Sequence, residues 1–319
     1  FPVTEIAFMD IDEQRLNLVT EFSRRMAAAS GQHLKIESST SLQESLEGAH
    51  FVVTQIREGG QEGRHWDTEL GKRHGIIGQE TTGVGGFSKA MRTIPKIMEI
   101  CREIERTAPN AWLINFTNPS GIITEAISRY SKVKVIGLCN VPVNMQMDIS
   151  ELLGIDPAEV FLDYVGLNHL AWVRHVFYRG QDLIGEVLRQ TPQQPANISK
   201  TKVPQELLQT LRMIPSPYLK YFYNTSEILE EQKNATKTRA QEVMEVEKQL
   251  LELYADANVN TKPELLSKRG GAYYSHAAID ILESIYKDSN RILVVNVPNQ
   301  GAVSGFNDTD VMEIPAVIG

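Results

Sequence analysis

Short apolar runs alternate with amphipathic stretches along the first half of the chain. The runs have the length and β-branched composition of strands and cover residues 6–9, 51–55, 112–116 and 133–138. Apolar side chains recur at helical spacing over residues 14–29, 88–107 and 119–130. Ser88 is the expected N-cap of the second of these helices. Strands that alternate with helices predict a doubly wound, Rossmann-like parallel sheet.

The second half of the chain has a less regular pattern. Apolar and polar side chains alternate over residues 160–178, which predicts an antiparallel strand pair. A polar loop with prolines at 190–205 precedes an amphipathic helix at 240–254, and residues 291–297 have the composition of a further strand. We therefore predict two domains, a Rossmann-like domain over residues 1–165 and a mixed α+β substrate domain over residues 166–319.

Composition narrows the class of protein. The chain has 319 residues, a formal charge of −8 and 42% apolar residues, which is typical of a globular protein with ample core. No apolar stretch reaches the roughly 18 residues that span a bilayer, and no secretory signal pattern opens the chain. Two cysteines cannot form a disulfide framework, and the acidic balance disfavours nucleic acid as a partner. We predict a cytoplasmic protein that binds neither membrane nor nucleic acid.

The two cysteines have different sequence contexts. Cys101 repeats with the apolar face of the 88–107 helix, so we interpret it as a core residue. Cys139 instead ends a strand, begins the turn Cys139-Asn140-Val141-Pro142, and is followed thirty positions later by His169. Thiolate and imidazole bind first-row metals, and two ligands leave positions open for water or substrate. From spacing alone a structural Cys and His are the commoner case, so both interpretations stay open at this point.

Polar residues follow the ends of several expected strands. They include Arg57, Asn115 to Pro119 and Cys139, and ligands of open α/β sheets bind at the carboxyl ends of the strands. Asp10 ends the first run, where a dinucleotide-binding fold places the acidic residue that binds the ribose hydroxyls. The alternative is that Asp10 and Asp12 only cap the next helix. The sequence predicts a binding site at this edge of the sheet.

Five motifs together resemble the NAD- and metal-dependent glycoside hydrolases of family 4. The motifs are Gly78-Gln79-Glu80-Thr81-Thr82-Gly83, Asn115-Phe116-Thr117-Asn118-Pro119, Gly137-Leu138-Cys139-Asn140-Val141-Pro142, Gly166-Leu167-Asn168-His169 and Pro217-Tyr218-Leu219. The resemblance covers nearly the whole chain, and the Asn-Val-Pro after the cysteine is similar to the 6-phospho-β-glucosidase type. It also implies a Gly-rich strand-turn-helix before Phe1 and further helices after Gly319, on a fold similar to lactate and malate dehydrogenases.

The resemblance implies a role for each catalytic position. Cys139 and His169 are expected to hold a divalent metal, Mn²⁺ by family likeness, which polarises sugar oxygens as a Lewis acid. Tyr218 is the expected base, and Glu80 is expected to modulate it. A phenol has an ordinary pKa near 10, so the base needs a positive neighbour. On the residues alone, Tyr221 or Tyr223 would serve equally well.

Binding positions are implied in the same way. Arg64 and Asn118 match substrate-binding positions, since guanidinium and amide groups bind phosphate and sugar oxygens. Arg239 is a candidate for the 6-phosphate, although a solvated charge at the start of a helix is nearly as good an interpretation. Asp10, Arg57 and Asn115 are assigned to the cofactor NAD.

The expected reaction is hydrolysis of a 6-phospho-β-glucoside, either a phosphorylated disaccharide such as cellobiose 6-phosphate or an aryl glucoside. NAD takes hydride from C3, the base removes the C2 proton and the aglycone leaves C1. Water then adds and the hydride returns to C3, without the usual pair of carboxylates. Family likeness suggests a homodimer or homotetramer. The alternatives are a malate/lactate-type dehydrogenase, a family 4 enzyme with α-glucosidase or galactosidase specificity, and a non-catalytic nucleotide-binding module.

Overall fold

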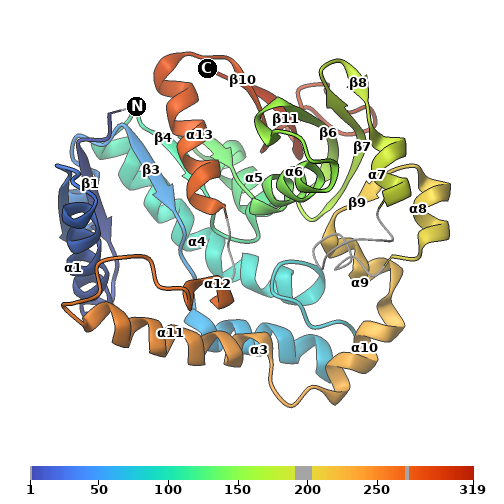
Figure 1. Ribbon diagram of the computed structural model, residues 1–319. Coiled ribbons are helices and arrows are strands. Elements are labelled where there is room, and N and C mark those ends of the chain that lie inside the picture. The colour runs from blue at the N-terminus through green and yellow to red at the C-terminus, as the bar shows by residue number, and fades with distance from the viewer. Residues whose placement is uncertain (1, 191–202, 270–272) are drawn as a thin grey trace.

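The computed structural model describes residues 2–190, 203–269 and 273–319. Most of the loop predicted at residues 190–205 therefore lies outside the described residues. Two sheets and one separate strand pair form the frame, with helices packed around them (Figure 1). Within the described ranges, no helix is both long enough and apolar enough to cross a membrane.

The larger sheet has five strands in the order β11-β10-β5-β4-β3. Its parallel strands are β3 (Phe51–Thr54), β4 (Trp112–Asn115) and β5 (Lys134–Gly137), and its antiparallel strands are β10 (Arg291–Pro298) and β11 (Val311–Ile318). A separate parallel pair joins β1 (Glu5–Met9) to β2 (Lys35–Ser39). The predicted strands of the first half are all present.

Helices cover both faces of this sheet, as a doubly wound fold requires. On one face α4 (Gly83–Thr107) and α5 (Ser120–Tyr130) pack on Leu113, and Cys101 lies fully buried in that layer, as predicted. On the other face α13 (Tyr274–Lys287) packs on Ile114. Successive residues of β4 thus face opposite layers, which is the strand period of two, and the predicted fold class is confirmed.

The smaller sheet is antiparallel and carries its own core. It is formed by β6 (Val160–Leu167), β7 (Leu170–Tyr178), β8 (Gln181–Asp182) and β9 (Ile214–Pro215). The helices packed here are α6 (Asn140–Leu153), α7 (Ile184–Gln190) and α8 (Gln205–Leu211). The predicted strand pair at 160–178 is confirmed, with Asn168 and His169 as its two-residue turn.

Most of the remaining helices lie along the left, lower and right sides of Figure 1. The remaining helices are α1 (Glu13–Ala29), α2 (Leu42–Leu46), α3 (Gly60–Arg73), α9 (Lys220–Tyr223), α10 (Thr225–Asn234), α11 (Arg239–Ala255) and α12 (Leu266–Arg269). The predicted helix at 240–254 is α11, which begins with a capping box between Thr238 and Gln241.

Two predicted boundaries are wrong. Ser88 is not an N-cap, because α4 begins at Gly83 with Thr82 before it. A Cβ on Gly85 would lie 2.3 Å from the Gln79 carbonyl oxygen, so close packing rather than a turn explains the glycine there. The segment after Cys139 is likewise the first turn of α6, with Cys139 as its N-cap and Pro142 inside the helix.

The two halves of the chain share the larger sheet. Strands β10 and β11 come from the second half but extend the sheet that β3, β4 and β5 begin. The predicted division between residues 165 and 166 falls inside β6. This interleaving brings residues near the end of the chain beside the loops of the first half.

Candidate active site

Cys139 and His169 meet where the two sheets adjoin. Cys139 directly precedes α6, and its sulfur accepts a hydrogen bond from the Val141 backbone N–H at 3.4 Å. His169 occupies the β6–β7 turn with φ of 68°, a left-handed conformation. The Cys139 Sγ and His169 Nε2 atoms are 3.5 Å apart, and the two residues are 5% and 4% exposed. We call these two side chains the thiol–imidazole pair.

Tyr218 lies flat against the imidazole of this pair. The two ring centroids are 3.6 Å apart, and the ring planes differ by 3°. The backbone places the ring there, because Ser216 N–H donates to the Ala171 carbonyl at 2.9 Å and so ties the segment to β7. Tyr221 is more distant, with its ring centroid 6.0 Å from that of Tyr218. The structure thus brings Cys139, His169 and Tyr218 into one group.

Burial keeps this group uncharged. It raises the pKa of the Cys139 thiol well above its usual value, and the charge of Glu313 acts in the same direction. Burial lowers the pKa of His169 to about 3 and raises that of the Tyr218 phenol above its ordinary range. Among the described atoms, His169 Nδ1 is buried without a hydrogen-bond partner. A cation would supply the positive charge that these three groups lack.

The thiol–imidazole pair fits a metal ion by its donor types and spacing. In tetrahedral zinc sites, metal–sulfur and metal–nitrogen bonds of about 2.3 and 2.1 Å separate the two donor atoms by about 3.6 Å. The observed separation of 3.5 Å agrees. Within the described residues, no group of three or more His, Cys, Asp or Glu side chains has a geometry that could hold a metal. Two protein ligands leave coordination positions open for water or substrate.

A second group is built around the carboxylate of Glu80. Arg64 Nη2 lies 2.9 Å from Oε1 and Lys89 Nζ lies 2.8 Å from Oε2, while Arg57 also forms an ion pair with Oε2. Burial opposes ionisation of Glu80, but attraction from the three cations outweighs it and lowers its pKa to about 2. We call these four residues the Glu80 cluster. The sequence placed three of them in the site, and the structure brings them together.

Lys89 is the member of the Glu80 cluster that no sequence motif marked. It is 2% exposed, and burial lowers its pKa to about 8. The spacing of residues along the helix indicates its burial, since Lys89 precedes the buried residues Thr93 and Ile97 by four and eight positions on one helix face. A lysine on the apolar face of a helix is rarely buried without a partner.

Asp10 and Asn115 were both assigned to the cofactor, but they lie in different environments. Asp10 is partly exposed at the end of β1, where one of its oxygens accepts the Asp12 N–H at 3.0 Å. Asn115 is fully buried, and its side chain bonds to Thr54 and Thr124 at 3.1 Å. Asn115 is therefore a structural residue beneath the strand ends. A partly exposed carboxylate at a strand end is the feature that fits a ribose diol.

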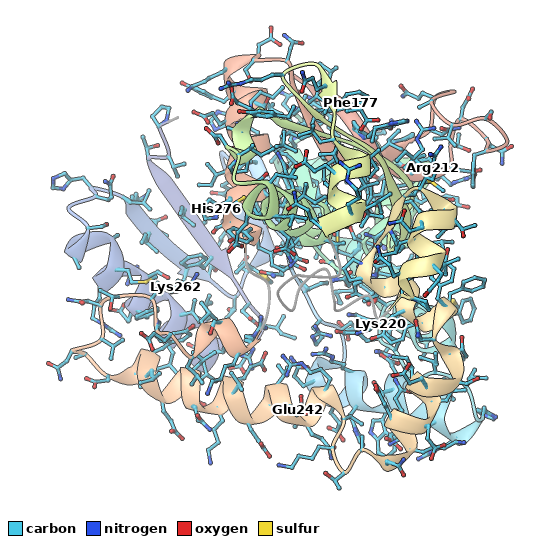
Figure 2. All side chains as sticks on the ribbon, turned by 45° about the vertical axis from the view of Figure 1, so that its right-hand side comes forward. Phe177, Arg212, Lys220, Glu242, Lys262 and His276 are labelled. Carbon is cyan, nitrogen blue, oxygen red and sulfur yellow. The ribbon has the colours of Figure 1, made fainter. Side chains whose placement is uncertain are left out.

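The predicted substrate positions also differ in exposure. Asn118 follows β4, is partly buried and precedes a cis proline, whereas Arg64 is 16% exposed at its side chain. Arg239 lies on the outside, paired with Glu242 at 2.9 Å and donating to the Lys268 carbonyl at 2.8 Å. Figure 2 shows Glu242 on α11 at the lower edge of the molecule. The charge of Arg239 still contributes to the lowered pKa of Arg64, after the larger effect of burial.

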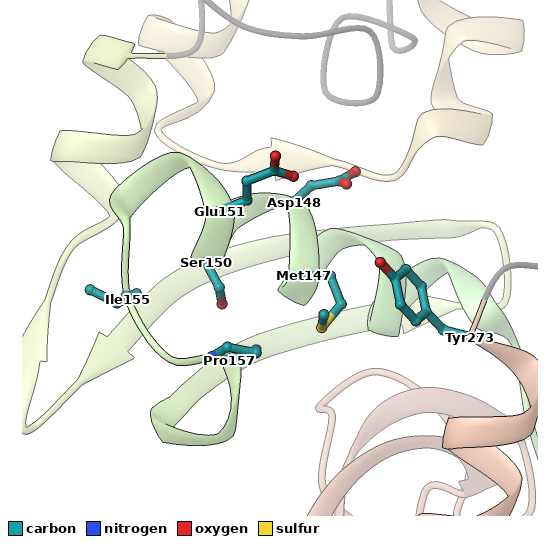
Figure 3. Close-up of a pocket in the computed structure, with 7 residues that line it drawn as sticks. All are labelled: Met147, Asp148, Ser150, Glu151, Ile155, Pro157 and Tyr273. Carbon is teal, nitrogen blue, oxygen red and sulfur yellow. The ribbon is translucent and has the colours of Figure 1, made fainter.

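A surface hollow lies at the other end of α6 (Figure 3). Met147, Glu151 and Tyr273 are among its lining residues. None of the residues predicted for the site lines it, so the hollow is separate from the thiol–imidazole pair.

Known proteins match the whole length of the chain. Residues 1–155 match the family described as family 4 glycosyl hydrolase, and residues 164–319 match the family 4 glycosyl hydrolase C-terminal domain. A Bacillus subtilis protein named "Probable 6-phospho-beta-glucosidase" is 40% identical, over 99% of this chain and 74% of its own. The 6-phospho-alpha-glucosidase of Leptotrichia buccalis is 29% identical, over 100% of this chain and 76% of its own.

Solved structures agree with these matches. The 6-phospho-beta glucosidase of Thermotoga maritima, solved with manganese, NAD⁺ and glucose 6-phosphate, has a TM-score of 0.91 at 37% identity. The match covers 99% of this chain and 74% of that one. Lactate dehydrogenase from Eimeria maxima matches 99% of this chain and 76% of its own with a TM-score of 0.55 at 16% identity, a likeness of fold alone. The expected similarity to the dehydrogenase fold is confirmed.

Proposed function

The chain belongs to family 4 of the glycosyl hydrolases, and from that premise we propose that it hydrolyses 6-phospho-β-glucosides to glucose 6-phosphate and an aglycone. The observation that carries the proposal is the buried thiol–imidazole pair with Tyr218 stacked on its imidazole, 3.6 Å between ring centroids. A hydrolase of the two-carboxylate type has no use for such a group. A malate/lactate-type dehydrogenase would leave it equally unexplained.

The β-glucoside is preferred over the α-glucoside for two reasons. The relative named for the β-glucoside is 40% identical, whereas the relative named for the α-glucoside is 29% identical. In addition, Asn140, Val141 and Pro142 follow the cysteine as in the β-glucosidase type. These residues form the first turn of α6, directly after the thiol.

In this proposal Cys139 and His169 hold a divalent ion, and Mn²⁺ is the choice supported by the Thermotoga maritima structure. When bound, the ion polarises the C2 and C3 oxygens of the glucosyl ring as a Lewis acid. Tyr218 accepts the C2 proton, because its ring is held against the imidazole of a ligand residue. Its raised pKa means that the phenol can act as a base only beside a positive charge.

NAD, when bound, supplies the hydride acceptor for C3 of the sugar. Asp10 at the end of β1 would bind the adenosine ribose, and Asn115 would act indirectly by holding the Thr117 turn through its internal hydrogen bonds. Arg57, a member of the Glu80 cluster that follows β3, is oriented by its ion pair with Glu80.

The Glu80 cluster suits an anionic substrate. Its three cations face a single carboxylate, so a net positive charge remains at the site. Arg64 and Asn118 would bind the phosphosugar. Arg239 would bind the 6-phosphate in place of its present ion pair with Glu242. We further propose that the enzyme works in the cytoplasm as a homodimer or homotetramer.

The test is hydrolysis of cellobiose 6-phosphate in D₂O with NAD⁺ and Mn²⁺ added. We expect glucose 6-phosphate that carries deuterium at C2, detected by NMR, with no net accumulation of NADH. Product without deuterium at C2 would exclude proton abstraction by Tyr218. Net NADH formation with a 2-hydroxy acid would support the dehydrogenase instead, and faster cleavage of a 6-phospho-α-glucoside would reverse the assigned specificity.

A further inference from the structure

We propose that Glu313 is a positioning residue that holds Cys139 and His169 at their metal-binding separation through Asn168. The inference rests on the proposed function only in taking the thiol–imidazole pair as the metal site. Glu313 lies on β11, far from the pair in sequence, and no motif in the sequence marked it. Its side chain is 0% exposed, so it acts through its neighbours rather than on substrate.

The carboxylate of Glu313 accepts hydrogen bonds from three side chains. Asn168 Nδ2 donates to Oε1 at 2.8 Å, Asn296 Nδ2 donates to Oε1 at 3.3 Å, and the Tyr164 hydroxyl donates to Oε2 at 3.1 Å. The backbone N–H of His169 also donates to it. A buried carboxylate with several donors is held rigidly in one orientation.

These bonds reach both members of the pair. Glu313 binds the side chain of Asn168 and the backbone of His169, which are the two residues of the β6–β7 turn. Asn168 in turn donates a hydrogen bond to the Cys139 sulfur. The carboxylate therefore fixes the imidazole through the turn and the thiol through the Asn168 amide. Groups that orient metal ligands in this way tune metal affinity.

Strand register brings Glu313 to this place. On the larger sheet Glu313 pairs with Asn296 of β10, and Asn296 pairs with Gly137 of β5, two residues before Cys139. Glu313 is therefore in the same row of the sheet as Gly137, the last residue of β5. Packing also confines Asn168, since a Cβ on Gly121 would lie 3.0 Å from the Asn168 Cβ.

The experiment measures binding of Mn²⁺ alone to the protein, without NAD or substrate, from the EPR signal of free Mn²⁺. Glu313→Ala and Asn168→Ala should each raise Kd by roughly 10- to 100-fold. Glu313→Gln should recover part of the loss, because its amide oxygen can accept from Asn168 while its NH₂ faces the Tyr164 hydroxyl. Co²⁺ bound to the same variants should show a weakened or shifted thiolate charge-transfer band.

Ser284→Ala is the matched control. Ser284 is fully buried and donates to the Ile318 carbonyl at 2.7 Å, so its loss loosens the end of β11 without touching Glu313. This variant should unfold at a lower temperature and keep the wild-type Kd and Co²⁺ spectrum.

The outcomes separate the inference from the function on which it rests. If Cys139→Ser abolishes binding but Glu313→Ala and Asn168→Ala bind Mn²⁺ as the wild type does, the positioning role is wrong and the metal site stands. If the wild type itself binds no Mn²⁺, both fail. Should Glu313→Ala not fold, Asn168→Ala decides, because it breaks the same link and leaves Glu313 bonded to Tyr164 and Asn296.

Discussion

The Glu80 cluster and the group of Cys139, His169 and Tyr218 are both buried, yet their protonation is opposite. In the Glu80 cluster the carboxylate has a pKa lowered to about 2, since three cations surround it. In the other group burial keeps the thiol protonated and lowers the pKa of the imidazole to about 3. The difference lies in partners rather than in burial, because desolvation disfavours charge in both places.

This contrast assigns the two regions different tasks. The Glu80 cluster carries its charges before any ligand arrives, so in the proposed function it is preorganised to attract an anionic sugar phosphate. Burial keeps the thiol–imidazole pair and Tyr218 neutral, and in the proposed function they become ligands and base only beside a cation. In the proposed function, proton abstraction by Tyr218 would therefore depend on an occupied metal site.

The largest expected effect is the loss of activity caused by Tyr218→Phe, a substitution that keeps the ring against the imidazole and removes only the hydroxyl. If Tyr218 is the base, kcat should fall by roughly 10²- to 10⁴-fold while Kd for Mn²⁺ stays constant. Steady-state kinetics and Mn²⁺ titration check this. Tyr223→Phe is the control and should retain the wild-type kcat. If Tyr223→Phe lowered kcat more than Tyr218→Phe does, Tyr223 would be the base instead.

Glu80→Gln should cost more stability than any single change among its cations. It leaves three buried or half-buried cations without their counter-ion, and removal of one partner from a buried ion pair costs roughly 3–5 kcal/mol. Lys89→Met should cost less, since Glu80 keeps Arg57 and Arg64. Urea unfolding of both variants compares the two losses, and equal losses would mean that Lys89 and Glu80 form an isolated pair.

The Glu80 cluster should also govern acid stability. The folded pKa of about 2 lies below the ordinary 4.5, so the contribution of Glu80 is complete above pH 4.5 and is lost as pH falls through about 2. This contribution of Glu80 to the free energy of unfolding is on the order of 3 kcal/mol. Thermal unfolding midpoints measured between pH 5 and 2 should fall less in Glu80→Gln than in wild type. Glu99→Gln, at an exposed surface pair, should follow the wild-type curve.

The smallest expected effect is stabilisation by metal. Mn²⁺ at about ten times Kd should stabilise the protein against unfolding by about 1.4 kcal/mol, because the ion binds the folded pair only. Differential scanning calorimetry with and without a chelator measures the shift. Cys139→Ser should abolish it, whereas Cys101→Ser, in a core helix away from the pair, should lower the midpoint in both conditions and leave the shift intact.

Several features were accessible from sequence because their signal is local. The strand preceding Cys139 and the alternation at residues 160–178 follow from side-chain periodicity, and the structure has both. The helical periodicity around Cys101 correctly predicted a core position for that cysteine. The start of α4 at Gly83 was missed because three early glycines disfavour a helix, and only close packing against Gln79 and Asp67 makes Gly85 necessary.

By itself the sequence determined which residues have the chemistry and which segments are strands and helices, because periodicity and residue type act over a few positions. Only the tertiary structure decided which of those residues meet. Glu313 contacts Asn168 although the two are 145 positions apart in sequence. Lys89 contacts Glu80 because it lies on the buried face of α4. Such contacts depend on strand register and on which face is buried, and these follow from the packing of the whole chain rather than from any local pattern.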